Sequence, residues 1–343
     1  MTADSRPVLN FGDFHITHVC NYNCDGCVRM SNYRFSGHQL WDDHKDHYAA
    51  LSKKFSIKLL GVSGGEPFLN PDLKKWLVGL RQLWPESDLW CGTNGSRLEF
   101  VDDLYPILLE HNIGLNICAH TKDKFDEINS YIRDFLQGPT TIQYRCDFAK
   151  WIECYNSVRQ VGWPDCSSIE EFDQLPDHIK EECKLHKHDP HTFLSARASF
   201  MYTDANGVRI MYNHSLDFVT ASVEYIGSDQ FNIFNSDPVE AHSACFSRYC
   251  HVLHRGKLYK CAHVGILPEF MDQYKVNISD EDKALLLDYK PLDTNASEEE
   301  TREFLSRIGK PIPQCKLCPS NIENFEINAS TDKPKVIKLK KLS

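Results

Sequence analysis

Three cysteines lie close together near the start of the chain. In the stretch HVCNYNCDGC, Cys20, Cys24 and Cys27 are separated by three and then by two residues, and they follow the apolar run FHITHV. A closed structural zinc site has four protein ligands, whereas three thiolates leave one coordination position for a ligand that is not protein. Thiolates also bind iron–sulfur clusters. The spacing therefore predicts a metal centre, which is either an iron–sulfur cluster with one free iron or a zinc knuckle that borrows a fourth ligand such as His18.

Two further polar motifs follow predicted strands. The run SIKLLGVSG leads into GGEP, which contains Gly64, Gly65 and Glu66, and the run SDLWCGTNG carries Asn94 near its end. Glycine lets a backbone approach a ligand closely, and a carboxylate can pair with an ammonium group. Because the carboxyl ends of parallel strands meet at one edge of a sheet, we expect both motifs and the cysteines to gather there.

The elements that would position these motifs are strands alternating with amphipathic helices. The expected strands are residues 14–19, 56–64, 87–95, 114–120 and 140–147, and the expected helices include 73–84 and 125–135. This alternation indicates parallel βαβ units, so the predicted fold class is α/β, with a doubly wound sheet or a (β/α) barrel. Tyr144, Arg145 and Asp147, at the end of the fifth strand of this series, are then expected to face the same cavity.

The regular alternation stops near residue 150. Residues 150–198 are rich in acidic residues and histidine and predict an insertion or lid. Glycine-containing turns predict hairpins at 199–212 and 251–263, with turns at Asn206-Gly207 and Arg255-Gly256. A capping box of Ser297 and Glu300 predicts a helix that ends at Gly309. A basic, frayed tail is expected over 326–343.

A second set of cysteines lies in the last third of the chain. Cys245 is followed by the predicted hairpin that ends in Cys261, and Cys315 and Cys318 form a later CxxC pair. A thiol on a glycine-turned hairpin together with a CxxC pair predicts a four-sulfur cage for zinc or for iron and sulfur. Cys250 is an alternative ligand or a residue on the substrate side.

The first set of motifs resembles the radical S-adenosylmethionine (SAM) superfamily, through CNYNCDGC followed by GGEP and TNG at successive strand ends. The resemblance implies a partial (β/α)6 barrel and a [4Fe-4S] cluster on Cys20, Cys24 and Cys27, with SAM on the fourth iron. It implies reductive cleavage of SAM to a 5'-deoxyadenosyl radical that takes a hydrogen atom from the substrate. Gly26 stands where the family commonly has an aromatic residue. The implied contacts to the cofactor are from Tyr22, Gly26, Gly64, Gly65, Glu66 and Asn94, with His120 a further candidate, and Gly64, Gly65 and Glu66 are expected to receive the methionine amino group.

The second set resembles the SPASM/twitch cluster-binding extension of many radical SAM enzymes. This resemblance implies one auxiliary [4Fe-4S] cluster on Cys245, Cys261, Cys315 and Cys318, since no cysteine follows Cys318. It divides the chain into a barrel over 1–240, a small α+β twitch-like domain over 241–325 and the tail. It also implies an external electron donor such as flavodoxin or ferredoxin.

Composition limits the classes of partner. The chain has 343 residues with a net charge of −10, which argues against a nucleic-acid backbone binder. No apolar run is long enough to span a membrane, and the start does not have the layout of a signal peptide, so we expect a cytoplasmic protein. Disulfides are rare in that compartment, so clustered cysteines among the fourteen indicate metal or redox sites. The histidines near Cys183 (His178, His186, His188 and His191) are expected to belong to a polar insertion, and Cys146, Cys154 and Cys166 to be buried thiols.

These features together predict a radical SAM oxidoreductase or maturase. Its substrate would be a peptide, a sugar or another small metabolite, oxidised or matured with help from the auxiliary cluster. One alternative is a radical SAM enzyme that modifies a nucleoside or an RNA base. The other is a zinc-binding module without catalytic activity, which would explain both cysteine sets but not the position of GGEP.

Overall fold

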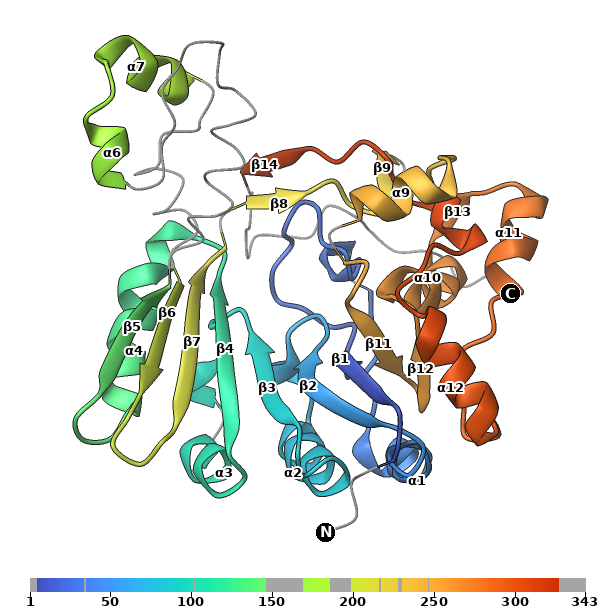
Figure 1. Cartoon of the computed structure of the whole chain (residues 1–343), viewed down its shortest axis with the longest axis horizontal. Helices are drawn as coiled ribbons and strands as arrows, with labels where there is room; N and C mark the ends of the chain where they lie inside the picture. The colour runs from blue at the N-terminus through green and yellow to red at the C-terminus, as the bar shows by residue number, and fades with distance from the viewer. Residues whose placement is uncertain are drawn as a thin grey trace.

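The chain folds around one large sheet, seen in the computed structural model in Figure 1. The structure describes residues 5–33, 35–100, 103–145, 169–185, 199–215, 217–227, 230–245 and 247–326. The sheet has nine strands in the order β12-β11-β1-β2-β3-β4-β7-β6-β5. Its centre is built from β1 (Val8–His15), β2 (Ser56–Ser63), β3 (Asp88–Thr93) and β4 (Ile113–Ala119), which are parallel to one another.

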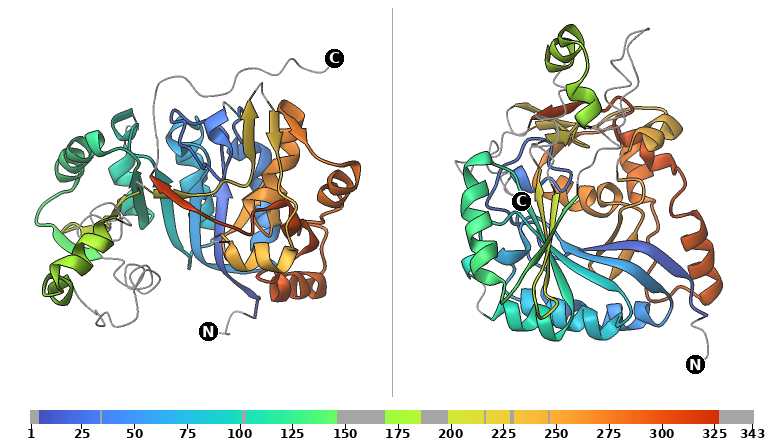
Figure 2. Two further views of the ribbon diagram at one scale, coloured as in Figure 1. Left: turned by 90° about the horizontal axis from the view of Figure 1, so that it is seen from above. Right: turned by 60° about the vertical axis from the view of Figure 1, so that its left-hand side comes forward.

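Helices connect these parallel strands and cover one face of the sheet. They are α1 (Trp41–Ser52), α2 (Leu73–Leu83), α3 (Leu104–Glu110) and α4 (Phe125–Phe135). The predicted apolar stripe of α2 is buried, with Leu73, Trp76, Leu77 and Leu80 at most 4% exposed. The sheet curves away from these helices (Figure 2) and encloses a cavity of about 590 Å³ on its other face, lined by Gly61, Trp90 and Asn116 among others. The predicted partial α/β barrel is therefore confirmed.

The position of the fifth predicted strand is wrong. β5 (Thr141–Arg145) does not pair with β4; it lies at the edge of the sheet and pairs antiparallel with β6 (Ser199–Thr203). The parallel neighbour of β4 is β7 (Arg209–His214). Burial explains the order, because β7 contributes Ile210 and Tyr212 to the core whereas Ile142 of β5 is 60% exposed. The side chains of Tyr144 and Arg145, and all of Asp147, lie outside the described residues.

Both predicted hairpins are present. β6 and β7 form the first, and Gly207 in its turn has a φ of 91°. The second consists of β11 (His251–His254) and β12 (Lys257–Tyr259), and its turn residues Arg255 and Gly256 have φ of 46° and 73°. This hairpin also joins the main sheet, because β11 pairs parallel with β1.

The C-terminal elements wrap around the β1 edge of the barrel (Figure 1). The predicted helix with the Ser297–Glu300 capping box is α12 (Glu298–Arg307). Leu253, Leu258 and Ile308 share one core with the barrel strands. A second core joins Tyr33 and Phe35, just beyond the first cysteine motif, to residues of α10 (Ala262–Gln273) such as Phe270. The packing thus crosses the predicted boundary at residue 240.

The remaining described elements are short. They are the helices α6 (Ile169–Asp173), α7 (Asp177–Leu185), α9 (Pro238–Ala244) and α11 (Asp280–Leu287), and the strands β8 (Asp217–Val219), β9 (Glu224–Gly227), β10 (Gln230–Asn232), β13 (Lys275–Asn277) and β14 (Asn324–Glu326). Of the predicted insertion over 150–198, the structure describes α6 and α7, which lie apart from the sheet in the right-hand view of Figure 2. Across the part of the chain that the structure describes, every helix is too short or too polar to cross a bilayer.

Candidate functional site

The first three cysteines lie in a loop directly after β1, at the carboxyl edge of the parallel strands. Cys24 is buried, and Cys20 and Cys27 are partly buried. Burial raises the pKa of the Cys20 thiol to about 12, and it also raises the pKa of Cys24, where the nearby Cys27 and Cys20 add to the effect. Thiols with such a raised pKa stay protonated at neutral pH unless a metal replaces the proton. The loop therefore places three thiols at one edge of the sheet, where a metal could bind them as thiolates.

The two glycines of GGEP let the cysteine loop pack against the end of β2. A Cβ on Gly65 would lie 2.2 Å from the carbonyl oxygen of Val19, and one on Gly64 would lie 2.4 Å from that of Thr17. The Gly65 and Glu66 amides donate to those carbonyl oxygens of Thr17 and Val19, at 2.7 and 2.8 Å. In addition to any approach of a ligand, these glycines fix the position of the loop that carries Cys20.

Glu66 is a fully buried carboxylate held by three donors. Its oxygens accept from the amides of Phe68 and Asn94 at 3.1 and 2.7 Å and from the hydroxyl of Thr93 at 2.8 Å. Burial raises its pKa to about 7 against the opposing effect of these hydrogen bonds. Asn94 reaches the cysteine loop as well, because its side-chain amide donates to Asn21 Oδ1 at 3.1 Å. The predicted gathering of the three motifs at one edge of the sheet is thus present in the structure.

The backbone explains the unusual glycine in the cysteine motif. Gly26 has a φ of 76°, in the left-handed region that favours glycine over residues with a side chain. Tyr22, also in the motif, is 5% exposed and makes an edge-on ring contact with His120, at the end of β4, with 6.4 Å between centroids. Of the predicted cofactor contacts from this loop, Tyr22 therefore faces the end of a neighbouring strand.

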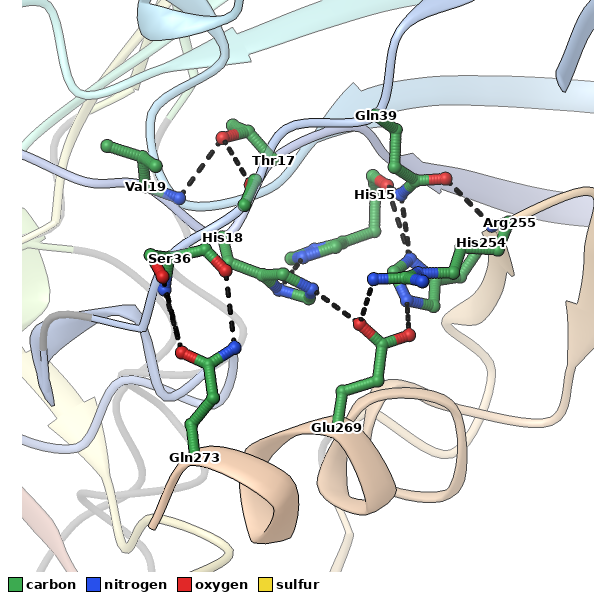
Figure 3. Close-up of polar contacts among 11 residues, drawn as sticks. His15, Thr17, His18, Val19, Ser36, Gln39, His254, Arg255, Glu269 and Gln273 are labelled. Atoms are coloured by element: carbon green, nitrogen blue, oxygen red, sulfur yellow. Dashed lines mark hydrogen bonds and ion pairs between the residues drawn. The ribbon is translucent and has the colours of Figure 1, made fainter. Parts of the chain in front are cut away.

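A buried histidine network, missed in the sequence analysis, lies beside the cysteine loop (Figure 3). Glu269 of α10 pairs with His18 Nε2 at 3.1 Å, with His254 Nε2 at 2.7 Å and with Arg255 at 2.7 Å. His15 Nε2 lies 2.8 Å from His18 Nδ1. His18 also stacks on the ring of Phe35, with 3.8 Å between centroids. The network connects β1, the C-terminal hairpin and α10 immediately before Cys20.

The hydrogen bonds occupy both ring nitrogens of His18 and of His254, but His15 Nδ1 is buried without a partner in the described part of the chain. With Glu269 ionised, His18 and His254 each donate from Nε2, so His18 Nδ1 accepts from His15. His254 Nδ1 accepts from the side-chain amide of Gln39 at 2.7 Å. The ligand atoms of His18, His254 and Glu269 lie within 4.8 Å of one another, so they could also hold a metal ion. His18 is occupied in this way and is not placed as a fourth ligand for the cysteines.

The second set of cysteines comes together as predicted. Cys245, Cys261, Cys315 and Cys318 line one cavity. Burial raises the pKa of Cys318 well above its usual range, and the charges of the other three thiols add to the effect. Lys260 lies beside them, 3% exposed, with its ammonium group 2.6 Å from the carbonyl oxygen of Ile308. Cys261 is also the residue before α10, so the positive end of that helix faces the site.

Cys250 lies on the side of this set that faces the first cysteine loop. It lines a neighbouring cavity together with Arg29, which follows Cys27 by two residues. Burial raises the pKa of Cys250 to about 12, with Asp13 raising it further and Arg29 lowering it. Cys245, Cys261 and Cys318 line this cavity too, so Cys250 remains an alternative ligand.

The distances between the cysteine sulfurs distinguish a site for a single zinc ion from a site for an iron–sulfur cluster. A single tetrahedral zinc ion, with bonds of about 2.3 Å, holds its sulfur ligands within about 4 Å of one another. Among the described residues, no three cysteine sulfurs lie within 4.8 Å of one another. A cluster spreads its sulfur ligands over several irons and requires wider spacing. The donor set therefore fits iron–sulfur clusters better than zinc knuckles.

The other candidate residues add little to these sites. His178 is exposed on α7. The side chain of Cys183 and all of His186, His188, His191, Cys146, Cys154 and Cys166 lie outside the described residues.

Comparisons with known proteins found similarities in the part of the chain that contains the first cysteine loop. Residues 14–170 match the model of the Radical SAM superfamily. A probable GTP 3',8-cyclase of Saccharolobus solfataricus is 30% identical over 113 residues, which cover 33% of this chain and 36% of the relative. Another, of Thermoplasma volcanium, is 25% identical over 185 residues, or 53% of this chain and 52% of the relative. The chain thus spans about a third to a half of these relatives.

A search of solved structures found two further partial similarities. BtrN in complex with AdoMet and 2-DOIA has a TM-score of 0.29 and 18% identity, over 36% of this chain and 52% of that one. Streptococcus suis SuiB bound to precursor peptide SuiA has a TM-score of 0.38 and 11% identity, over 91% of this chain and 66% of that one. By the family model, residues 14–170 are a radical SAM domain.

Proposed function

We propose that this protein is a radical SAM enzyme that removes a hydrogen atom from a peptide, a sugar or another small metabolite. The observation that carries the proposal is the meeting of Cys20, Cys24 and Cys27 with Glu66 and Asn94 at the carboxyl ends of β1, β2 and β3. The cysteines would hold a [4Fe-4S] cluster, which with SAM and one electron would supply the radical chemistry for removal of the hydrogen atom. The electron comes from an external donor such as a flavodoxin or a ferredoxin.

Glu66 is suited to receive the amino group of SAM. An ionised carboxylate offers about four acceptor positions. Donors from Phe68, Thr93 and Asn94 occupy three of these positions and hold the group still. An ammonium group would take the remaining position and offset the cost of burying the charge. Gly64 and Gly65 support this arrangement by fixing the cysteine loop against the end of β2.

The second cysteine set is proposed to hold an auxiliary [4Fe-4S] cluster. Four thiols line one cavity and would carry negative charge when they bind a metal. The buried Lys260 and the start of α10 would both stabilise that negative charge. Such a cluster would accept the electron that remains on the substrate after hydrogen abstraction, which makes the net reaction an oxidation. This role belongs to an oxidoreductase or a maturase.

The test is a count of iron and acid-labile sulfide in protein reconstituted without oxygen. We expect about eight irons per chain, and about four in a variant with Cys20, Cys24 and Cys27 all changed to Ala, which should also form no 5'-deoxyadenosine. Changing Cys245, Cys261, Cys315 and Cys318 to Ala should remove the other four. Cys118→Ala, a thiol of β4 outside both sets, is the matched control. Stoichiometric zinc without sulfide would overturn the proposal.

A second candidate substrate is a nucleotide, because the curated relatives above are named as probable GTP 3',8-cyclases. Their similarity extends over only part of each chain, so the substrate does not follow from the name. Incubation of the reconstituted enzyme with SAM, reductant and GTP distinguishes the candidates. Formation of 5'-deoxyadenosine that rises with GTP, together with loss of GTP, would favour the nucleotide; no change would favour another substrate.

A further inference from the structure

Several buried polar atoms without a hydrogen-bond partner line one cavity between the two cysteine sets. Among the described residues, the unpartnered atoms include Arg29 Nη1, Ser222 Oγ and both ring nitrogens of His263. All three residues line the same cavity, together with Cys250 and with Cys245, Cys261 and Cys318 of the second cysteine set. A buried donor or acceptor left unpaired costs free energy, so unpartnered atoms that share a cavity indicate a ligand.

Asp13 holds one nitrogen of the Arg29 guanidinium, and another nitrogen, Nη1, has no hydrogen-bond partner among the described residues. Its Nη2 donates to Asp13 Oδ2, and Asp13 also accepts from the hydroxyl of Ser63 at 2.8 Å. The side chain of Arg29 is only 11% exposed. Cys250 and Cys27 lie close enough to raise the pKa of its guanidinium. Arg29 therefore lies between the first cysteine loop and the second cysteine set, with Nη1 free to donate.

The three residues supply mainly donors. Arginine can only donate, a serine hydroxyl can donate, and an imidazole can donate from one ring nitrogen. His263 is 5% exposed, so water does not satisfy it readily. A group that only accepts hydrogen bonds complements such a set, and ionised carboxylates and phosphates are groups of this kind.

We propose that this cavity binds an oxyanion of the substrate, a carboxylate or a phosphate, through Arg29, Ser222 and His263. The inference rests on the proposed function, since the cavity adjoins both cysteine sets. It narrows the substrate to a molecule with an anionic group close to the atom that loses hydrogen. The group would be held by Arg29 on the barrel side and by Ser222 and His263 on the C-terminal side.

The test is anion binding by the reconstituted protein saturated with SAM, followed by ligand-observed NMR. The probes are inorganic phosphate, acetate and acetamide, a neutral molecule of nearly the same shape as acetate. We expect phosphate or acetate to bind one per chain, and acetamide not to bind. Arg29→Gln should raise the dissociation constant at least fivefold. Arg248→Gln, which changes an arginine beside the adjoining four-cysteine cavity, should leave it unchanged.

Ser222→Ala and His263→Ala serve as second variants, because Arg29→Gln leaves Asp13 without its partner and could unfold the chain. Each should weaken binding at least twofold. The inference is overturned if neither anion binds better than acetamide, if folded Arg29→Gln binds like the unchanged protein, or if it does not fold and the other two variants bind normally. Binding of phosphate alone or of acetate alone identifies the anion. Iron, sulfide and 5'-deoxyadenosine measured on the same samples test the proposed function separately.

Discussion

Individual glycines determine the geometry of the cysteine loop. Gly26 takes a positive φ inside the motif, and Gly64 and Gly65 remove the side chains that would otherwise push the loop away from β2. The aromatic residue common at the position of Gly26 would be strained at this φ. At this scale, the departure from the family pattern is an adjustment of the backbone and does not remove a ligand.

Gly65→Ala should displace the cysteine loop. The new Cβ would lie 2.2 Å from the Val19 carbonyl oxygen, a backbone atom that can move only with the loop. We expect a loss of stability of about 2 kcal/mol or more and a lower iron content after reconstitution. Gly92→Ala is the matched control, because its Cβ would lie 3.6 Å from the closest atom. Thermal unfolding and iron analysis check both, and equal iron in the two variants would contradict the role given to Gly65.

Glu66 should make stability depend on pH. Burial raises its pKa from 4.5 to about 7, so the folded chain binds this proton more tightly than the unfolded chain does. The free energy of unfolding should therefore fall by about 3 kcal/mol as pH rises from about 4.5 to about 7. Glu66→Gln should not show this fall, although an amide facing three donors lowers its stability at every pH. Urea unfolding of cluster-free protein at pH 5 and pH 8 tests this; identical pH dependence in the two proteins would refute it.

At the scale of elements, α10 connects the two cysteine sites. It begins directly after Cys261, and two turns later Glu269 pairs with His18, two residues before Cys20. Burial acts to raise the pKa of Glu269, but the hydrogen bonds from His18 and His254 outweigh it and hold the pKa well below its usual range. One helix thus contacts both cysteine sites, with Pro268 inside it directly before Glu269.

Glu269→Gln should loosen this connection. Gln keeps the size of the side chain but loses the charge that Arg255 and the two histidines share, so we expect a loss of about 2 kcal/mol in stability. Gln273→Ala is the control on the same helix, because its bond to Ser36 is exposed and should be worth less than about 0.5 kcal/mol. Thermal unfolding of both variants measures the difference. If the two variants have the same melting temperature, the Glu269 network contributes no more to stability than an exposed hydrogen bond does.

The sequence predicted individual helices, strands and turns better than it predicted which strands and side chains contact one another. Local signals were sufficient for α2, for both hairpin turns and for the capping box of α12, because the residues that decide them are neighbours. β7 pairs with β4 across an intervening segment of 89 residues, and no local pattern encodes this pairing. The link between His18 and Glu269 joins residues 251 positions apart. The histidine spacing at the end of β1 was a signal, but its partner could be found only in three dimensions.

For the whole molecule, the structure couples the barrel to the C-terminal region more closely than a division at residue 240 suggests. β11 extends the sheet beside β1, and Leu253, Leu258 and Ile308 belong to the barrel core. The segment after the first cysteines packs against α10 in the second core. A protein built in this way would hold the two proposed clusters at a fixed separation, as the proposed electron transfer from the substrate requires.

A chain that ends at residue 240 should therefore not fold on its own. It would leave the β1 edge without β11 and would expose core side chains that β11, β12 and α12 now cover. A chain that ends at residue 326 is the matched control; because it loses only the predicted basic tail, its melting temperature should stay within about 2 °C of the full chain. Circular dichroism and thermal unfolding of the two chains make the comparison. A cooperative transition in the shorter chain, with three-cysteine iron binding intact, would show that residues 1–240 are an independent domain and that the shared cores matter little for stability.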